Sequence, residues 1–304
     1  MLTGLANLSM QGRWQAAMVI AVMSLMALAI PPVSYLASGI IALGTLRAGP
    51  KEGITVVAIA TIVFAIAATF LLNQPHITGL FLISSWLPVY GVTLIFGYTR
   101  SLAVSLLVTA GIGLLLVVGA YIVLPDPAAW WLQMVGPFVE MLQAKPDWQL
   151  EQAETESFVA ALSSMMTGLI FAGLFTNVVL GLLLGRAWQA DLYNQGGFTE
   201  EFQQLQLGKG PAIITVAVAL SALLPGAGFA IMQDCLPVLL VLFAVQGVAV
   251  VHALVRLQQK HKAWLIVMYI LLLIMMPQMV FLLALIGVLE QWFNFRQRSV
   301  EHGE

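Results

Sequence analysis

The chain has 304 residues, of which 61% are hydrophobic and only 9% are charged, and its mean hydropathy is +0.96. A soluble domain carries roughly a quarter charged residues, so this composition excludes an ordinary water-soluble globule. A net charge of −2 without a large basic cluster also excludes a nucleic-acid-binding protein. Apolar runs of about 18 or more residues recur along the chain, and each is long enough to cross the lipid core as a helix. We therefore predict an all-α, polytopic integral membrane helix bundle of about 8–10 transmembrane segments embedded in a lipid bilayer.

Residues 1–124 contain the N-terminal spans. The run that follows Arg13 has the look of a signal peptide, but it ends in Pro31 and Pro32 and further apolar runs follow at once. We therefore expect a retained first span rather than a cleaved leader. Prolines lack an amide donor and should break the helix before the second span. The five spans predicted here are residues 14–30, 33–46, 54–72, 80–98 and 102–124.

Residues 125–157 differ in character from the spans on either side. Prolines at 125 and 127 end the fifth span, and large apolar residues then recur at roughly helical spacing: Trp130, Trp131, Met134, Phe138 and Met141. This spacing predicts an amphipathic helix at the membrane interface, where tryptophan is favoured. The acidic stretch that follows, with Asp147, Glu151, Glu154 and Glu156, predicts a solvated exterior loop. Its spacing is not that of a metal site.

Residues 158–187 form a long apolar stretch in which small or short polar residues repeat every fourth position. One row is Ala160, Ser164, Gly168, Ala172 and Thr176, and the other is Gly173, Asn177, Gly181 and Gly185. In lipid, helices associate where small residues let their backbones approach closely. The two rows predict a central helix that packs against neighbours on two sides.

The rest of the chain is predicted to hold a polar cytoplasmic insert, further spans and a tail, at 188–210, 211–290 and 291–304. Pro277 interrupts the last apolar stretch, which is either one kinked span or two short passes. Lysine and arginine in short loops mark the cytoplasmic side, and two passes would place both termini there. We expect one membrane domain over residues 1–304, in a bacterial inner membrane, with cytoplasmic termini.

The sequence carries no common catalytic signature: HExxH, GxSxG, a Walker loop and CxxC are all missing. The single cysteine, Cys235, excludes an internal disulfide. The four histidines are scattered, which does not predict a metal cluster. We therefore predict no catalytic residue, no metal and no cofactor, and expect a protein that is not an enzyme.

Polar residues at membrane depth are the candidate site residues, because burying them in lipid is costly. Asp234 would bind a cation, a proton or a polar group of a substrate. The alternative, slightly favoured, is that it lies wet at the exterior interface and caps a helix. Asn177 and Gln246 are expected to hydrogen-bond neighbouring helices. Trp86 and Tyr90 flank a proline break, and broken helices mark transport sites, although a kink without a ligand is more frequent.

Three stretches resemble the YybS-like family of bacterial membrane proteins, a family of unknown function. They are Ile30-Pro31-Pro32 with the 43–53 turn LGTLRAGPKEG, the span end FAVQGVAVVHALVR at 243–256, and IGVLEQWFNFRQR at 286–298. In the last stretch an acidic residue, aromatics and a basic pair occupy the family's places: Glu290, Trp292, Phe293, Phe295, Arg296 and Arg298. The resemblance implies a bacterial inner-membrane protein. The family is distantly similar to the substrate-binding subunits of energy-coupling-factor vitamin transporters, and no ligand residue carries over.

Two functions follow as hypotheses. The first is small-molecule binding or transport, which predicts a polar-lined cavity near Asp234 and the Trp86–Tyr90 break, and a partner surface at residues 188–209. The second is a non-transporting membrane scaffold that binds other envelope proteins. It predicts a packed bundle without a pocket and exposed aromatic residues such as Trp130 and Trp131.

Overall fold

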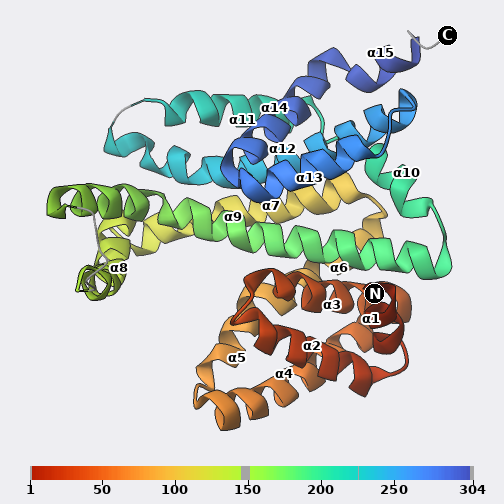
Figure 1. The fold of residues 1–304 in the computed structure, drawn as a ribbon, viewed down its shortest axis with the longest axis horizontal. Helices are drawn as coiled ribbons and strands as arrows, with labels where there is room; N and C mark the ends of the chain where they lie inside the picture. Colours follow the sequence, from red (N-terminus) through yellow and green to blue (C-terminus); the bar gives the residue numbers. More distant parts are fainter. Residues whose placement is uncertain (1, 145–150, 225, 302–304) are drawn as a thin grey trace. The chain divides into compact units, whose positions relative to one another are not determined.

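The computed structural model describes residues 2–144, 151–224 and 226–301, and within these ranges the chain forms helices and no strand (Figure 1). The prediction of an all-α fold is confirmed. Part of the predicted acidic loop, including Asp147, lies outside the described residues, as does Pro225.

The first half of the chain forms α1 (Leu2–Ser9), α2 (Arg13–Ala27), the 3-10 turn η1 (Pro31–Val33), α3 (Ser34–Ala48), α4 (Pro50–Leu72), α5 (His76–Phe81), the π-helical segment η2 (Leu82–Trp86), α6 (Leu87–Thr99), α7 (Leu102–Val123) and α8 (Pro127–Gln143). The second half forms α9 (Gln152–Tyr193), α10 (Gly197–Gln203), α11 (Lys209–Ala222), the 3-10 turn η3 (Ala227–Phe229), α12 (Ala230–Leu257), α13 (Ala263–Ile274), α14 (Met276–Phe293) and α15 (Phe295–Glu301).

Among the described residues, six helical stretches are long and apolar enough to cross a membrane: α4, the continuous α5–η2–α6 stretch, α7, α9, α12 and α14. Three shorter apolar helices, α2, α11 and α13, have 12–15 residues. At about 1.5 Å per residue these three reach only about 18–23 Å, less than the roughly 30 Å of a lipid core. By length and composition, the chain fits a multi-pass membrane protein.

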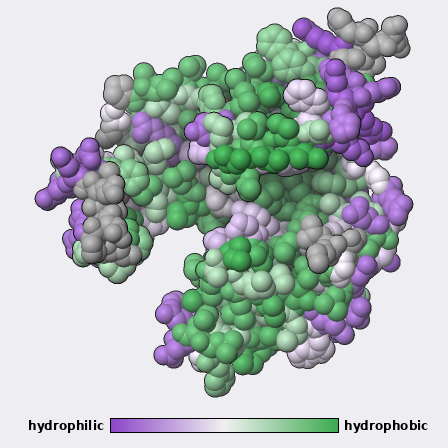
Figure 2. Space-filling view, viewed as in Figure 1, coloured by the Kyte–Doolittle hydropathy of each residue, from purple (hydrophilic) through white to green (hydrophobic). Residues whose placement is uncertain are grey.

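The surface supports the same class of protein. Figure 2 shows hydrophobic residues over most of the visible surface, whereas hydrophilic residues gather near helix ends. Phe70, Ile122 and Leu273 are 83%, 79% and 87% exposed. Large exposed apolar areas on a monomer indicate a surface that meets lipid or another protein.

The chain divides into two compact units. Unit one comprises Met1–Thr109, Leu174–Gln206 and Ala249–Arg256, and unit two comprises Ala110–Gly173, Leu207–Val248 and Leu257–Glu304. The first part of α9 belongs to unit two and its last part to unit one. The two units are described separately below, and the predicted single membrane domain stays a prediction.

The helix boundaries decide whether the apolar stretch around Pro277 is one kinked helix or two helices. The chain forms two helices, α13 and α14, with Met275 between them in a non-helical conformation (φ −122°, ψ 51°). Pro277 lies in the first turn of α14, where its missing amide donor breaks no helical hydrogen bond. Figure 1 shows α14 turning back from the end of α13. The apolar stretch is therefore two helices rather than one kinked helix.

Glycines in both predicted rows of α9 give close helix contacts. In unit two, a Cβ on Gly168 would overlap the backbone of Asp234 in α12. In unit one, a Cβ on Gly181 would overlap Ser38 of α3, and a Cβ on Gly185 would overlap the next turn of α3. These contacts confirm that small residues let α9 approach its neighbours closely. Gly173 differs, because nothing lies within 4 Å of its Cβ position.

A second pair of glycines joins α12 to α14 in unit two. A Cβ on Gly247 would overlap the carbonyl oxygen of Leu283, and a Cβ on Gly287 would overlap that of Phe243. Each obstacle is backbone rather than a flexible side chain, so a methyl group at either position must push the two helices apart.

We predict that Gly247→Ala lowers stability by about 1–3 kcal/mol, the usual cost of overpacking a close contact. The matched control is Gly111→Ala in α7, where nothing lies within 4 Å of the Cβ position. That change should leave stability equal or raise it by up to about 1 kcal/mol. Thermal unfolding in detergent can be followed with a thiol-reactive dye, because the single cysteine, Cys235, is buried and becomes reactive on unfolding. Equal melting temperatures for the two variants would contradict the packing described.

Candidate functional site

The Asp234 carboxyl group joins three helices of unit two. Its Oδ2 accepts a hydrogen bond from the Tyr121 hydroxyl of α7 at 2.7 Å, and its Oδ1 accepts one from the Gly168 N–H of α9 at 2.9 Å. Asp234 itself lies in α12 and is only 2% exposed. Because Gly168 has no side chain, the α9 backbone comes close enough to donate to the carboxylate.

The slightly favoured sequence interpretation of Asp234 is therefore wrong. The side chain is buried rather than wet, and it accepts from other helices rather than capping the start of α12. Its position near the beginning of an apolar helix suggested an interfacial site, but the close approach of α9 covers it. Within the described ranges, no lysine, arginine or histidine forms an ion pair with this carboxyl group.

Other buried polar groups lie close to Gly168 on α9. The Trp131 indole N–H of α8 donates to the Thr167 hydroxyl at 3.0 Å. Ser163, one helical turn earlier, is 2% exposed, and its hydroxyl has no hydrogen-bond partner among the described residues. The segment of α9 at residues 163–168, which covers the Asp234 carboxylate, therefore also carries two buried hydroxyl groups. The sequence singled out only Asp234 as a candidate here.

Asn177 is the centre of a hydrogen-bond network in unit one. Its Oδ1 accepts from the hydroxyls of Ser38 at 3.0 Å and Ser85 at 2.9 Å, and its Nδ2 donates to the Ser34 hydroxyl at 2.9 Å. Ser34 and Ser38 lie on α3, and Ser85 lies in η2. The prediction that Asn177 bonds neighbouring helices is confirmed. Both the oxygen and the nitrogen of the amide bond protein groups, which favours a packing role.

The predicted break near Trp86 and Tyr90 is a π-helical segment. Trp86 ends this segment, is fully buried and packs edge-on against Phe64 with ring centroids 5.6 Å apart. The Tyr90 hydroxyl donates to the Pro50 carbonyl at 3.1 Å. Pro88 lies in the first turn of α6, so the helix stays continuous. Trp86 and Tyr90 belong to unit one and Asp234 to unit two, so the structure does not assemble them into one described site.

Gln246 links backbone groups of unit two. Its Oε1 accepts from the Leu207 N–H at 2.8 Å, and its Nε2 donates to the Gly287 carbonyl at 2.8 Å. The side chain is fully buried. Gln246 therefore also bonds neighbouring segments as predicted, and both ends of its amide are satisfied.

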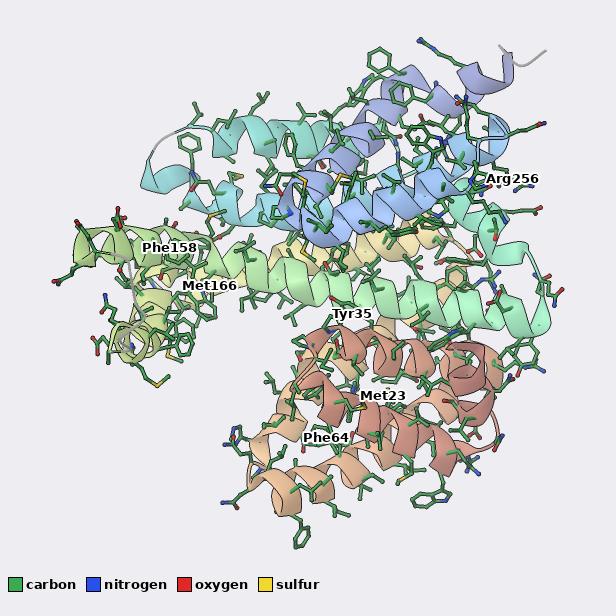
Figure 3. The ribbon with its side chains drawn as sticks, viewed as in Figure 1. Met23, Tyr35, Phe64, Phe158, Met166 and Arg256 are labelled. Carbon is green, nitrogen blue, oxygen red and sulfur yellow. The ribbon has the colours of Figure 1, made fainter. Side chains whose placement is uncertain are left out.

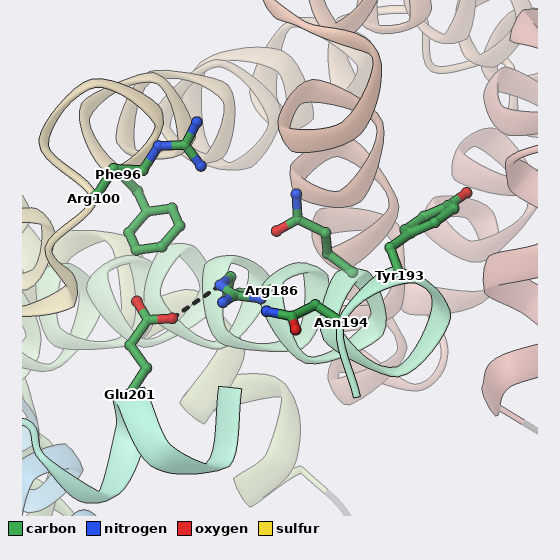
Figure 4. A pocket seen from close by; sticks show the side chains of 7 residues that line it. Phe96, Arg100, Arg186, Tyr193, Asn194 and Glu201 are labelled. Carbon is green, nitrogen blue, oxygen red and sulfur yellow. Dashed lines mark hydrogen bonds and ion pairs between the residues drawn. The ribbon is translucent and has the colours of Figure 1, made fainter. Parts of the chain in front are cut away.

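A polar cavity that the sequence did not predict lies in unit one, between α6, α9 and α10 (Figure 4). Its volume is about 270 Å³, and it is lined by Phe96, Arg100, Arg186, Gln189, Tyr193, Asn194 and Glu201. Arg186 donates through Nε to Glu201 Oε2 at 2.9 Å. The turn at residues 194–197 reverses the chain and brings Glu201 back to Arg186. That turn was the only sequence signal that pointed to this pair.

Burial raises the pKa of the Glu201 carboxyl group, while the positive charges of Arg186 and Arg100 act in the opposite direction. One carboxylate oxygen, Oε1, is buried and has no hydrogen-bond partner among the described residues. The Arg47 guanidinium of α3 stacks 4.2 Å from the centre of the Tyr193 ring, although Arg47 itself does not line the cavity. The cavity therefore combines two guanidinium groups, those of Arg100 and Arg186, with one incompletely bonded carboxylate.

No family model, no curated protein and no solved structure matches the chain. The fold itself thus defines the class: the described part of the chain is all-helical, and six of its helical stretches are long and apolar enough to cross a membrane. Among the described residues, no group of three or more histidine, cysteine, aspartate or glutamate side chains is placed to hold a metal ion.

We predict that Asn177→Ala lowers the free energy of unfolding by about 1–3 kcal/mol, because it leaves buried hydroxyl groups without their shared acceptor. Asn7→Ala, at an exposed position of α1, is the matched control and should change stability by less than about 0.5 kcal/mol. Thermal unfolding of both variants in detergent measures the difference. If the two variants melt alike, the network contributes nothing to stability.

A raised pKa of Glu201 in the folded state means that folding is favoured by protonation of this carboxyl group. This contribution to the free energy of unfolding is complete below the ordinary glutamate pKa of about 4.3. It disappears as the pH rises through the raised pKa that Glu201 has in the folded protein. Glu201→Gln does not titrate, so its melting temperature relative to the wild type should increase over that rise in pH. Glu200→Gln, at an exposed position of the same helix, is the matched control. Tryptophan fluorescence melts across pH test this, and a constant difference for Glu201→Gln would contradict it.

Proposed function

We propose that the chain is a multi-pass protein of the bacterial inner membrane that binds and transports a small solute, and that Asp234 is the ionisable residue of its membrane-depth site. Six apolar helices and the large exposed apolar side chains support a membrane location. Basic residues in short connections, such as Arg47 and Lys51 or Lys260 and Lys262, support cytoplasmic termini. Membership of the YybS-like family stays a prediction.

The observation that carries the proposal is the burial of Asp234 without a cation among the described residues. Taking a carboxylate out of water costs several kcal/mol unless a charge or a proton compensates. Tyr121 and Gly168 supply hydrogen bonds to both oxygens, but no positive charge. Ionisable residues kept at this cost inside membrane segments usually mark ion pathways or proton relays. Asp234 would accordingly take up a proton or a small monovalent cation as part of the transport cycle.

The scaffold hypothesis keeps one specific observation in its favour. α8 exposes Met134, Phe138 and Met141 to 57–60%, and Trp130 to 37%. We propose that this face lies in the membrane interface, as the amphipathic pattern predicts. The alternative is that it docks a partner protein, in which case a partner should copurify with the wild type and be lost on Phe138→Ser. A structure with a polar cavity departs from the solidly packed bundle that the scaffold hypothesis predicts.

Binding of a proton or a cation to Asp234 stabilises the folded state by mass action. We therefore expect the melting temperature of the purified protein in detergent to depend on pH, or on sodium or lithium at constant ionic strength with choline as the replacement cation. Asp234→Asn should remove the part of that dependence that comes from Asp234, whereas the pH dependence that Glu201 contributes should remain. Tryptophan fluorescence during heating supplies the measurement.

Asp126→Asn is the matched control, because the Asp126 carboxylate caps α8 by accepting from the Ala129 N–H at 3.0 Å. Asparagine caps helices as well as aspartate, so this variant should respond to pH and cations as the wild type does. An unchanged response in Asp234→Asn would show that the carboxyl group binds neither a proton nor a cation in this range, and would remove the basis of the proposal.

A further inference from the structure

The cavity between α6, α9 and α10 carries an excess of positive charge. Arg100 and Arg186 line it, Arg47 stacks on its Tyr193 wall, and Glu201 is its only lining carboxylate among the described residues. Asp191 and Glu200 lie on the same helices, but they are exposed and do not line the cavity. Two lining guanidinium groups against one lining carboxylate leave an excess of positive charge, which favours an anionic ligand such as a phosphate monoester.

Arg100 supplies an uncommitted cation at this cavity. Its guanidinium forms no hydrogen bond or ion pair with another part of the chain that the structure describes. The residue ends α6 in the left-handed conformation (φ 54°), a position usually taken by glycine or asparagine. Figure 4 shows Arg100 on the α6 side of the cavity, with Arg186 and Glu201 on α9 and α10.

Glu201 supplies the second, independent sign of a ligand. Oε2 accepts from Arg186, whereas the buried Oε1 has no donor among the described residues. Buried polar atoms in folded proteins almost always have a partner, and a ligand donor would reach this buried oxygen once the Glu201 carboxyl group turns toward the cavity. A hydroxyl or amino group of a ligand would fill that place.

The size and walls of the cavity limit the ligand further. A volume of about 270 Å³ is small compared with pockets for drug-sized molecules. It corresponds to roughly nine water molecules at their liquid volume. Phe96 and Tyr193 provide apolar surface, and Gln189 and Asn194 provide amides that can donate or accept.

From these features we propose that the α6–α9–α10 cavity binds a small hydroxylated phosphate ester, with Arg100 and Arg186 on the phosphate and Glu201 Oε1 accepting from a ligand hydroxyl. Forked guanidinium groups match phosphate oxygens in charge and geometry. The same chemistry is present in free glycerol 3-phosphate and in the headgroup of phosphatidylglycerol. The site is separate from Asp234 and does not depend on the function proposed for that residue.

Isothermal titration of the full-length protein in an uncharged detergent tests the soluble source, with glycerol 3-phosphate, inorganic phosphate and glycerol as probes. We expect saturable binding of glycerol 3-phosphate, and weaker binding of the other two. Arg100→Gln should weaken it at least about ten-fold, whereas Lys51→Gln, an exposed charge of α4 outside the cavity, should leave it unchanged. Because the Arg100 side chain is exposed and unbonded, its replacement should fold normally.

The lipid source is tested by native mass spectrometry of protein taken from nanodiscs of phosphatidylglycerol or phosphatidylcholine. Phosphatidylglycerol retained by the wild type and by Lys51→Gln, but lost by Arg100→Gln, would assign the site to a lipid headgroup. Failure of both sources to bind saturably, or equal binding by the two variants, would overturn the proposal. Inorganic phosphate that binds as tightly as glycerol 3-phosphate would overturn the role of Glu201. Asp234→Asn should bind like the wild type, so failure here is distinct from failure of the transport proposal.

Discussion

Close helix approach at glycines, combined with a hydrogen bond beside the contact, is the constraint on which the two units depend. Gly168 meets the Asp234 backbone and donates to its carboxylate. Gly181 lies against Ser38, a partner of Asn177, and the Gly287 carbonyl accepts from Gln246. Between apolar helices in lipid, packing and hydrogen bonds replace the hydrophobic effect as the source of association. A side chain at any of these glycines would separate the polar groups as well as the backbones.

The sequence predicted the helices and the general role of Asn177 and Gln246, because hydropathy and the cost of polar groups in lipid are local properties. It could not supply their partners. Serine is common in apolar helices and often bonds its own carbonyls, as Ser84 does with Leu80. Asp234 was misplaced for a related reason: its burial depends on Gly168, which is 66 residues away in the chain. The cavity needs residues from α6, α9 and α10, and nothing in their spacing predicts that they meet.

Most buried polar side chains of these units are satisfied by protein groups, and two places stand apart. At Asp234 a carboxylate has donors but no cation, and at the α6–α9–α10 cavity guanidinium groups exceed carboxylates. At both places the described side chains leave a charge without an equal opposite charge, and these are the places where a small ion and a small anion are proposed to bind. A scaffold would need neither arrangement, and satisfied amides such as those of Asn177 and Gln246 would be sufficient for it.

Infrared difference spectroscopy of the protein in lipid, recorded on a pH step and on exchange of choline for sodium, tests the central claim about Asp234 most directly. If Asp234 exchanges a proton or a cation, we expect a carboxyl or carboxylate stretching band that changes with one of these steps. This band should be absent in Asp234→Asn and should persist in Asp126→Asn. A band that remains in Asp234→Asn, or no change of the Asp234 carboxyl group under either step, would contradict the claim that this buried group exchanges a proton or a cation.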